Sequence, residues 1–195
     1  MHHPSLIPAA ALAGLLLAGC ASIAPANVAT SPEQHRHVVV LDIDGTLTPH
    51  NLYVFEVRPA APQVLQAYAR KGYTIIYLTT RIPLFQPPLA AWLRDNGFPP
   101  GTLHVAQSAA ERDDAASFKA AILKQYQAAG WQLAYAYGDS PSDFDAYARA
   151  GMPRARVYAL KRRHAMDCAG DHFGTCLDGW TEHLPFVERE VPHSR

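Results

Sequence analysis

The sequence has no excess of charge of either sign. It holds 17 Lys and Arg residues against 17 Asp and Glu residues, so its formal net charge at pH 7 is zero. Proteins that hold a nucleic-acid backbone need a surplus of basic side chains, usually gathered in one patch. This sequence has neither the surplus nor a dense basic patch, which excludes nucleic acid as its main partner. It also contains no internal repeat, and its 195 residues suffice for one well-buried domain.

A long apolar run is also missing. The Ala- and Leu-rich segment Leu6–Ala18 is too short to span a bilayer as an ordinary transmembrane helix. It leads into Leu17-Ala18-Gly19-Cys20, which resembles the lipobox of bacterial lipoproteins. That resemblance implies a signal peptide over residues 1–19, cleaved before Cys20, and lipid attached to the Cys20 thiol. The alternative is a plain secretory signal cleaved elsewhere.

The residues after Cys20 indicate where such a lipoprotein resides. Ala21 stands where an Asp often retains lipoproteins at the inner membrane, so we expect an outer-membrane lipoprotein of the bacterial cell envelope that faces the periplasm. Residues 20–35 are small, polar and Pro-containing, and we expect a flexible tether there. The membrane is then a partner through the lipid anchor, and residues 36–195 form the folded domain.

Cysteine is scarce, with three residues in the chain. If Cys20 is lipidated, Cys168 and Cys176 remain as a pair in an oxidising compartment, which favours a disulfide between them. A zinc site is the alternative, because His and Cys recur at every fourth position, at His164, Cys168, His172 and Cys176. A third alternative is that the pair has no special role.

Strand-like and helix-like patterns alternate along the domain. Buried strands are predicted at residues 38–41, 73–78, 103–105, 133–137 and 156–160. Helices are predicted between them, at residues 61–70, 84–96, 114–129 and 143–150. This alternation predicts an α/β fold with a five-stranded parallel sheet and helices on both faces. From Lys161 onward no periodicity is clear, and we expect an irregular cover pinned by the cysteines.

The first strand ends in two carboxylates, Asp42 and Asp44, followed by Gly45. An Asp at the carboxyl end of a parallel strand lies where open α/β sheets bind ligands. Two such carboxylates repel each other unless a cation or a shared proton intervenes. The pattern predicts Asp42 as a nucleophile that attacks phosphorus and Asp44 as its general acid and base. A surface loop with a satisfied turn is the alternative.

Hydroxyl and basic side chains follow the second strand and occupy a later helix. Thr79 and Thr80 are placed to bind phosphoryl oxygens, although Thr79 is also a candidate helix cap. Arg81 offers a planar fork to a phosphate or a carboxylate, or serves the structure alone. Lys119 is predicted to stabilise charge on the transferring phosphoryl group, with Lys124 as the competing candidate. A solvated surface position is the alternative for either lysine.

Two more carboxylates, Asp139 and Asp143, follow the fourth strand. Mg²⁺ takes a few hard oxygen ligands and keeps several waters. We predict Mg²⁺ as the cofactor, bound by Asp42, Asp139 and the backbone carbonyl of Asp44. Asp143 completes the set directly or through water. Its alternative role is a helix N-terminal acid stabilised by the helix dipole.

Together these motifs resemble the haloacid dehalogenase (HAD) superfamily of phosphatases. The resemblance extends from about His37 to Leu160 and rests on Asp42–Thr46, Thr79, Lys119 and Gly138–Asp143. It implies a Rossmann-like fold and an aspartyl-phosphate intermediate on Asp42. It also implies phosphate binding by Thr79 and Lys119, and a magnesium site that includes Asp139 and Asp143.

The lipin-type phosphatidate phosphatase domain is a closer resemblance. It is carried by Asp42–Thr48, Tyr77–Arg81, Phe118-Lys119, Tyr137–Asp143 and Ala150–Tyr158. It implies phosphatidate or a related lipid phosphate as substrate. The short stretch between the first two motifs leaves little room for a cap domain, so a large or membrane-held ester would have access. The alternatives are a periplasmic phosphatase of soluble esters and a non-catalytic lipid-binding module, as in related phospholipid-transfer proteins whose module lacks the nucleophile.

Overall fold

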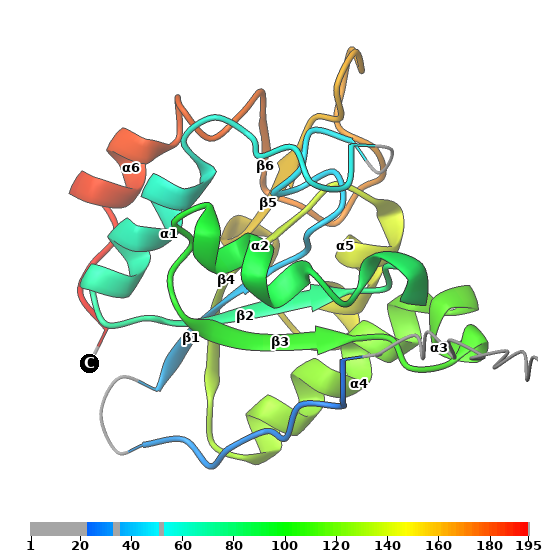
Figure 1. Cartoon of the computed structure of the whole chain (residues 1–195). Helices are drawn as coiled ribbons and strands as arrows, with labels where there is room; N and C mark the ends of the chain where they lie inside the picture. The colour runs from blue at the N-terminus through cyan, green and yellow to red at the C-terminus, as the bar shows by residue number, and fades with distance from the viewer. Residues whose placement is uncertain (1–22, 33–35, 51–52, 195) are drawn as a thin grey trace, which may run out of the picture.

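Six parallel strands form one sheet in the computed structural model, which describes residues 23–32, 36–50 and 53–194 (Figure 1). In chain order the strands are β1 His37–Leu41, β2 Thr74–Thr79, β3 Gly101–Val105, β4 Gln132–Gly138, β5 Val157–Leu160 and β6 Thr175–Leu177. Their spatial order is β3-β2-β1-β4-β5-β6, and every neighbouring pair is parallel. The chain thus proceeds outward in one direction from β1 and in the other from β4. This switch point between β1 and β4 is where open sheets of this kind bind ligands.

The central strand β1 is buried on both faces, as its unbroken β-branched run predicts. Val39 and Leu41 pack into the core on one face, and Val38 and Val40 into the core on the other. All four side chains are fully excluded from solvent. The strand therefore leads straight from the buried core to the carboxylate Asp42.

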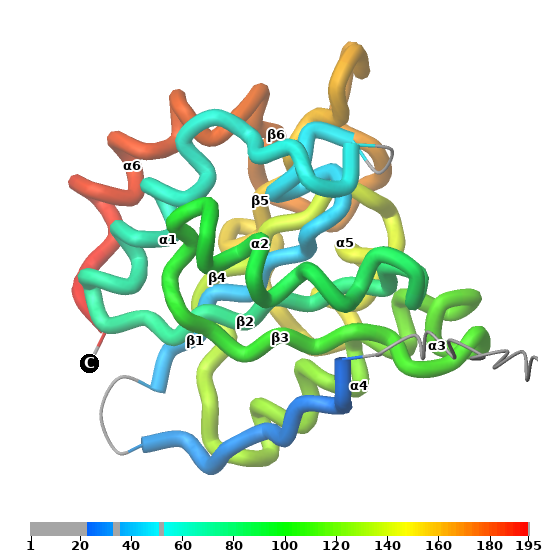
Figure 2. Tube along the Cα trace, viewed as in Figure 1, coloured from blue at the N-terminus to red at the C-terminus, as the bar shows by residue number. Residues whose placement is uncertain are grey.

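Helices cover both faces of the sheet. One face packs against α1 Ala61–Arg70, α2 Leu89–Asp95 and α6 Leu184–Arg189, and the other against α4 Ala115–Ala128 and α5 Pro141–Arg149. The tube in Figure 2 shows α1 and α6 side by side at the end of the molecule away from α3. The short elements are α3 Ala109–Asp113, η1 Pro83–Phe85 and η2 Arg154–Arg156. The predicted α/β class with helices on both faces is confirmed.

The C-terminal segment corrects the prediction of five strands and an irregular tail. It adds a sixth strand, β6, which pairs with β5 through Ala159 and Cys176, and the helix α6, which packs on α1. The strand is only three residues long, so it offers no periodicity to detect. The helix predicted at residues 84–96 is also shorter, because Pro87 and Pro88 confine it to Leu89–Asp95.

Cys168 and Cys176 are joined by a disulfide with an Sγ–Sγ distance of 2.10 Å. The bond leaves neither sulfur available as a thiolate, so the zinc alternative for this pair is wrong. It fixes the loop after β5 to strand β6. The predictions for residues 1–22, including lipidation of Cys20, lie outside the described residues. No helix within the described ranges is long and apolar enough to cross a membrane.

Residues 23–32, predicted as part of a flexible tether, pack against the domain. Ile23 and Val28 lie against the two cores, one on each. The Trp131 indole donates to the carbonyl of Ala29 at 2.7 Å, and the backbone N–H of Ser31 donates to Ala129 at 2.9 Å. The segment packs instead of remaining a solvated tether because burial of its spaced apolar side chains contributes favourable free energy.

Trp180 ties the C-terminal segment to the loop after β1. Its side chain is 1% exposed and packs 4.8 Å from the Tyr137 ring, centroid to centroid. Its indole N–H donates to the carbonyl oxygen of Thr46 at 2.9 Å. The loop that carries Asp42 and Asp44 is therefore supported by a residue near the far end of the chain.

A buried hydrogen-bond relay lies behind the same region. The hydroxyls of Tyr68 and Tyr137 are 2.6 Å apart, and the Tyr137 hydroxyl is 2.8 Å from His183 Nε2. Burial lowers the pKa of His183 to about 4, from 6.5 for a free histidine. His183 is thus neutral in the folded protein at pH 5, whereas the unfolded chain binds a proton there.

Acidification between pH 6.5 and pH 4 should therefore destabilise the fold through His183, because only the unfolded state takes up this proton. The expected loss at pH 5 relative to pH 7.5 is on the order of 2 kcal/mol. His183→Gln should remove this contribution from urea-unfolding free energies measured at the two pH values. His193→Gln, at an exposed position, is the matched control. Equal acid sensitivity of wild type and His183→Gln would contradict the assignment.

Candidate active site

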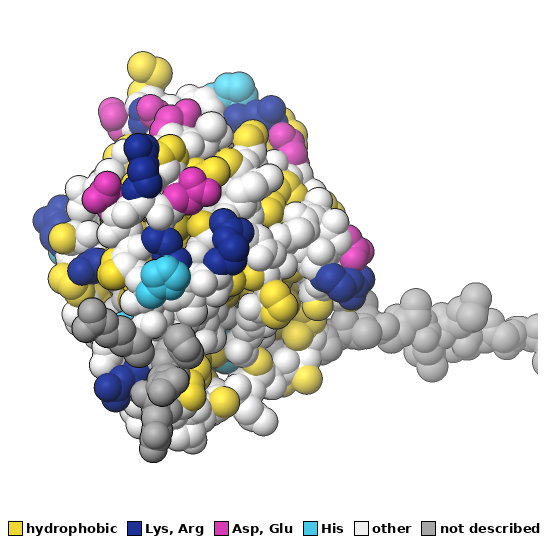
Figure 3. Space-filling view, turned by 90° about the vertical axis from the view of Figure 1, so that its left-hand side faces the viewer, with side chains coloured by type: hydrophobic (Ala, Val, Ile, Leu, Met, Phe, Trp, Pro, Cys, Tyr) yellow, Lys and Arg dark blue, Asp and Glu magenta, His cyan; other side chains and the backbone are white. Residues whose placement is uncertain are grey.

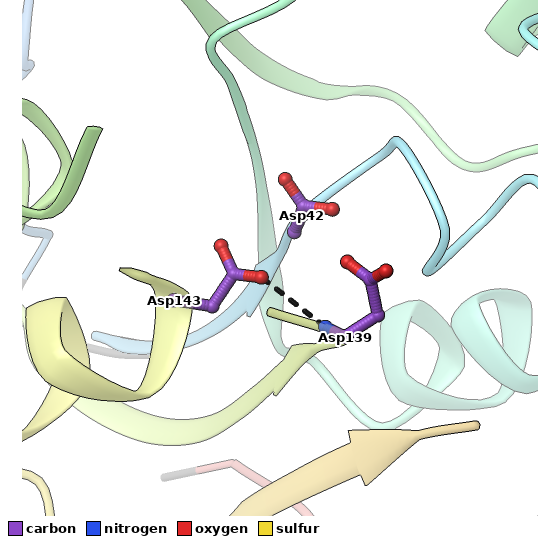
Figure 4. A group of neighbouring side chains, drawn as sticks. All are labelled: Asp42, Asp139 and Asp143. Carbon is purple, nitrogen blue, oxygen red and sulfur yellow. Dashed lines mark hydrogen bonds between the residues drawn. The ribbon is translucent and has the colours of Figure 1, made fainter. Parts of the chain in front are cut away.

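Three buried carboxylates meet at the switch point of the sheet. Asp42 follows β1, Asp139 follows β4, and Asp143 lies in the first turn of α5 (Figure 4). One carboxylate oxygen from each lies within 4.8 Å of the others, and none of the three side chains is more than 4% exposed. Figure 4 shows the carboxylates turned toward a common space above the strand ends. These are three of the four acids that the strand ends predicted.

The turn after β1 is shaped by Gly45. Its φ is +87°, and a Cβ at this position would lie 2.0 Å from Asp139 Oδ2. Only glycine lets the two strand ends approach this closely. The Thr48 hydroxyl accepts a hydrogen bond from the Gly45 N–H at 3.0 Å. The Thr46 hydroxyl is buried without a hydrogen-bond partner.

Lys119 places a buried ammonium group between two of the carboxylates. Its Nζ donates to Asp42 Oδ1 at 2.6 Å and to Asp143 Oδ1 at 2.5 Å. Lys124, the competing candidate, is exposed on the outer side of α4. The structure therefore selects Lys119 as the lysine that faces the acids.

Burial dominates the electrostatics of this cluster. It raises the pKa of the Asp42 carboxyl well above its ordinary value, and the charge of Asp143 adds to that shift while Lys119 opposes it. Burial and Asp143 likewise raise the pKa of Asp139 to about 6. Burial alone would lower the pKa of Lys119, but Asp143 and Asp42 hold it above its usual value. The carboxylates therefore need more positive charge than Lys119 supplies.

A divalent cation fits the cluster. Asp42 Oδ2 is buried and has no hydrogen-bond partner, although the other oxygen of that carboxylate is bound by Lys119. Three carboxylates in reach of one point make the hard-oxygen donor set that Mg²⁺ prefers. The residues present thus match a magnesium site formed by Asp42, Asp139 and Asp143.

The carboxylate of Asp44 is bound by an arginine and a threonine, which is not the environment expected of a carboxylate that binds a metal ion. Arg81 holds it through a fork, with Nη2 donating to Oδ1 at 2.7 Å and Nε donating to the same oxygen at 3.0 Å. The Thr79 hydroxyl donates to Asp44 Oδ2 at 2.9 Å. The Asp44 side chain is therefore turned away from the acidic cluster. Metal contact through its backbone carbonyl stays a prediction.

These contacts match the carboxylate alternative for Arg81, and its phosphate-binding role stays a prediction. Its guanidinium pairs with the nearer acceptor, the Asp44 carboxylate, because a fork of two N–H donors matches a carboxylate well. The Thr79 hydroxyl donates a hydrogen bond to Asp44 and accepts one from the backbone N–H of Arg81 at 3.1 Å. Thr80 is half-buried beside them, and its phosphate-binding role stays a prediction.

Two arginines at the site were missed by the sequence interpretation. The Arg162 side chain donates to Asp139 Oδ2. The Arg58 side chain donates to the carbonyl of Gly45 at 2.7 Å and of Thr48 at 3.1 Å, which braces the turn. Arg162 carries a usable signal, because it closely follows β5 and so lies at the same sheet edge. Arg58 lies in a loop, and no pattern marks it.

A protein-family model described as "PITM 1-3, LNS2 domain" matches residues 39–161. Human membrane-associated phosphatidylinositol transfer protein 3 is 27% identical over 157 residues, which are 77% of this chain and 15% of that protein. Protein retinal degeneration B of Drosophila melanogaster is 30% identical over 126 residues, which are 63% of this chain and 10% of the relative. The chain thus spans a small part of the length of these relatives.

Solved structures share the fold. D,D-heptose 1,7-bisphosphate phosphatase from B. bronchiseptica, complexed with magnesium and phosphate, has a TM-score of 0.58 at 14% identity, covering 80% of this chain and 99% of that one. A HAD-like phosphatase from Mesorhizobium loti has a TM-score of 0.55 at 15% identity, covering 86% and 91%. At such identities the likeness shows the fold alone, and the chemistry must be argued from the residues of the site.

Lys119→Met should destabilise the protein by about 3–5 kcal/mol at pH 8, because it leaves the buried Asp42 and Asp143 without their counter-charge. The loss should shrink at pH 5, because burial raises the pKa of Asp42 and this carboxyl is then more readily protonated, and adding Asp143→Asn should recover part of it. Urea unfolding followed by circular dichroism measures all three effects. Lys124→Met, on the same helix, should change stability by less than about 0.5 kcal/mol. If the two lysine variants have the same free energy of unfolding, the buried ion pair does not contribute this stability.

Proposed function

The chain belongs to the LNS2 domain family and has the fold of the haloacid dehalogenase superfamily, and from this premise we propose that it hydrolyses phosphomonoesters. The observation that carries the proposal is the carboxylate of Asp42. It lies at the carboxyl end of the central strand, with one oxygen bound by Lys119 and the other free of hydrogen bonds. A carboxylate held in this way keeps one oxygen without a hydrogen bond, which supports a bond to phosphorus or to a cation.

The proposed reaction has two steps. In the first, a carboxylate oxygen of Asp42 forms a bond to phosphorus while the bond to the ester oxygen breaks, and Asp44 gives that oxygen a proton. In the second, Asp44 takes a proton from water as the water oxygen attacks the aspartyl-phosphate, which releases phosphate and restores Asp42. Lys119 stabilises the charge on the phosphoryl oxygens. Because Arg81 and Thr79 hold Asp44, its acid–base work requires the carboxylate to turn from them toward Asp42.

Mg²⁺ is the cofactor that we propose for this site, held by Asp42, Asp139 and Asp143. When bound, it supplies charge neutralisation to the carboxylates and to the phosphoryl group of the substrate. Arg162 balances the charge of Asp139 from the solvent side. The buried Lys119 opposes the rise that burial causes in the pKa of Asp42, which favours the ionised form that cation binding requires.

We propose phosphatidate or a related lipid phosphate as the substrate. The family and the names of its lipid-transfer relatives support a lipid, and the described residues between β1 and β2 form only α1 and loops, so no cap domain closes the site. A cavity of about 520 Å³ is lined in part by Arg58, Arg162 and Trp180, and Arg162 connects it to Asp139, whose carboxylate this arginine contacts. It offers room for the group that carries the phosphate.

Two other functions make different predictions. A phosphatase of soluble esters in the periplasm would act on small phosphomonoesters and leave phosphatidate in mixed micelles untouched. A non-catalytic lipid-binding module is the other alternative, and the names of the lipid-transfer relatives are its support. Such a module would bind vesicles without Mg²⁺ and release no phosphate. The free oxygen of Asp42 favours catalysis over the second.

Asp42→Asn should lower phosphate release by about 10³-fold or more, because an amide cannot act as the nucleophile. Malachite-green detection of phosphate, across phosphatidate in mixed micelles and soluble esters with and without Mg²⁺, measures this. Asp145→Asn, an exposed acid on α5 that pairs with Arg149, should retain activity. Circular dichroism of both variants checks that the fold persists. Full turnover by Asp42→Asn would rule out the mechanism.

We further propose that the chain is an exported lipoprotein anchored through Cys20. The Cys168–Cys176 disulfide supports export, because such bonds persist in oxidising compartments. Several acyl chains on one cysteine would anchor the protein stably.

Cys20→Ser should abolish incorporation of radiolabelled palmitate in bacteria that express the full chain. The variant should move from the membrane fraction to the soluble periplasmic fraction, because it has lost its lipid anchor. Cys168→Ser with Cys176→Ser is the matched control and should still be labelled. Labelling of Cys20→Ser at the wild-type level would contradict the anchor.

A further inference from the structure

Large apolar side chains are exposed on loops at the carboxyl edge of the sheet, the edge that carries the three acids. Among the described residues, the exposed large hydrophobic side chains all lie in loops that follow β1, β2 and β5, and we call them the apolar rim: Tyr53, Phe55, Ile82, Leu84 and Met166. Leu84 is 69% exposed and Met166 is 87% exposed. Single exposed hydrophobic residues are ordinary, but a concentration on one edge of a domain marks an interaction surface.

Direct contacts join the three loops into one surface. The rings of Phe55 and Phe85 lie 6.3 Å apart, edge to face, which links the loop after β1 to that after β2. The Arg163 guanidinium lies 4.9 Å from the Tyr53 ring centroid and pairs with Glu56 at 3.2 Å, which links the loop after β1 to that after β5. Figures 1 and 2 show the cyan loop after β1 beside the orange segment after β5.

The loop after β2 is unusual in composition. Residues 82–88 read Ile-Pro-Leu-Phe-Gln-Pro-Pro and contain no charged side chain. The single polar side chain, Gln86, is buried and donates to the carbonyls of Arg81 and Ala106. The segment is thus held firmly from below while its apolar side chains face solvent. Such a loop gains free energy when an apolar medium covers it.

Basic side chains accompany the apolar rim. The loop after β5 begins Lys161-Arg162-Arg163-His164 and carries no acid before Asp167. The side chains of Arg162 and Arg163 are 37% and 40% exposed. Acidic and basic side chains lie intermingled on the face shown in Figure 3. Lys161, Arg162 and Arg163 each pair with an acid, namely Asp178, Asp139 and Glu56 respectively. The exposed parts of the two arginines, beside the apolar tips, complement a surface that is anionic at its face and apolar beneath.

We propose that the apolar rim docks on the surface of an anionic phospholipid bilayer. Leu84 and Met166 enter the acyl region, Tyr53 and Phe55 lie at the level of the headgroups, and Arg162 and Arg163 face lipid phosphates. Docking in this orientation turns the mouth of the site toward the bilayer. The consequence for turnover rests on the proposed function, because only a phosphatase would use that orientation to reach a membrane-held ester.

Fluorescence quenching tests the docking. Leu84→Trp and Met166→Trp each add an indole at the rim, and Glu188→Trp adds one on α6 as the matched control. The full chains are mixed with phosphatidylcholine–phosphatidylglycerol vesicles whose acyl chains carry bromine. The rim indoles should be quenched beyond the wild-type background and the α6 indole should not, and high salt should weaken the effect. Absence of quenching at both rim positions, or equal quenching on α6, would overturn the proposal.

Turnover separates this inference from the proposed function. Leu84→Ser with Met166→Ser should hydrolyse soluble p-nitrophenyl phosphate at the wild-type rate but phosphatidate in anionic vesicles about tenfold more slowly, since two inserting side chains are lost. An unchanged vesicle rate would overturn the docking and leave the phosphatase intact. A wild-type protein that hydrolyses neither ester would refute the proposed function, while quenching would still decide the docking.

Discussion

The buried ammonium group of Lys119 is the contact on which the rest of the site depends. It touches Asp42 at the end of β1 and Asp143 in α5, and so fixes α4 against both elements. The second oxygen of Asp143 accepts from the N–H groups of Asp139 and Ser140 at 3.1 and 3.0 Å. One carboxylate therefore joins a helix, a strand end and a turn, and removing the lysine would leave two buried charges uncompensated.

The position of the site follows from sequence because strand ends in a parallel sheet share one edge. That rule places Asp42, Asp139 and Asp143 together without any knowledge of distances. It does not say which partner each side chain takes. From sequence, either a phosphate or a carboxylate could be the partner of Arg81. The structure pairs it with Asp44, because the end of β2 packs against the turn after β1. The three-residue β6 and the contact from Trp180 to Thr46 depend on long-range pairing that leaves no local period.

The basic side chains around the three acids fall into two groups, one buried and one partly exposed to solvent. Lys119 is 3% exposed and serves the inner carboxylates, whereas Arg162 reaches Asp139 from the solvent side. Arg81 and Thr79 donate hydrogen bonds to the carboxylate of Asp44, which is not one of the three acids that Lys119 and Arg162 contact. The acid proposed for proton transfer is thus held apart from the acids proposed for metal binding. Two carboxylates only one residue apart in sequence acquire different environments because they point to different neighbours.

The hydrogen bond from Trp180 to the carbonyl of Thr46 joins residues 134 positions apart. A contact of that span is among the last that a growing chain can make, since both ends must be present before it forms. A growing polypeptide can therefore pair its first strands while the turn beside Asp42 still lacks its support. The turn that carries Asp42 therefore gains this support only after residue 180 has been made, later than the strands on either side of it.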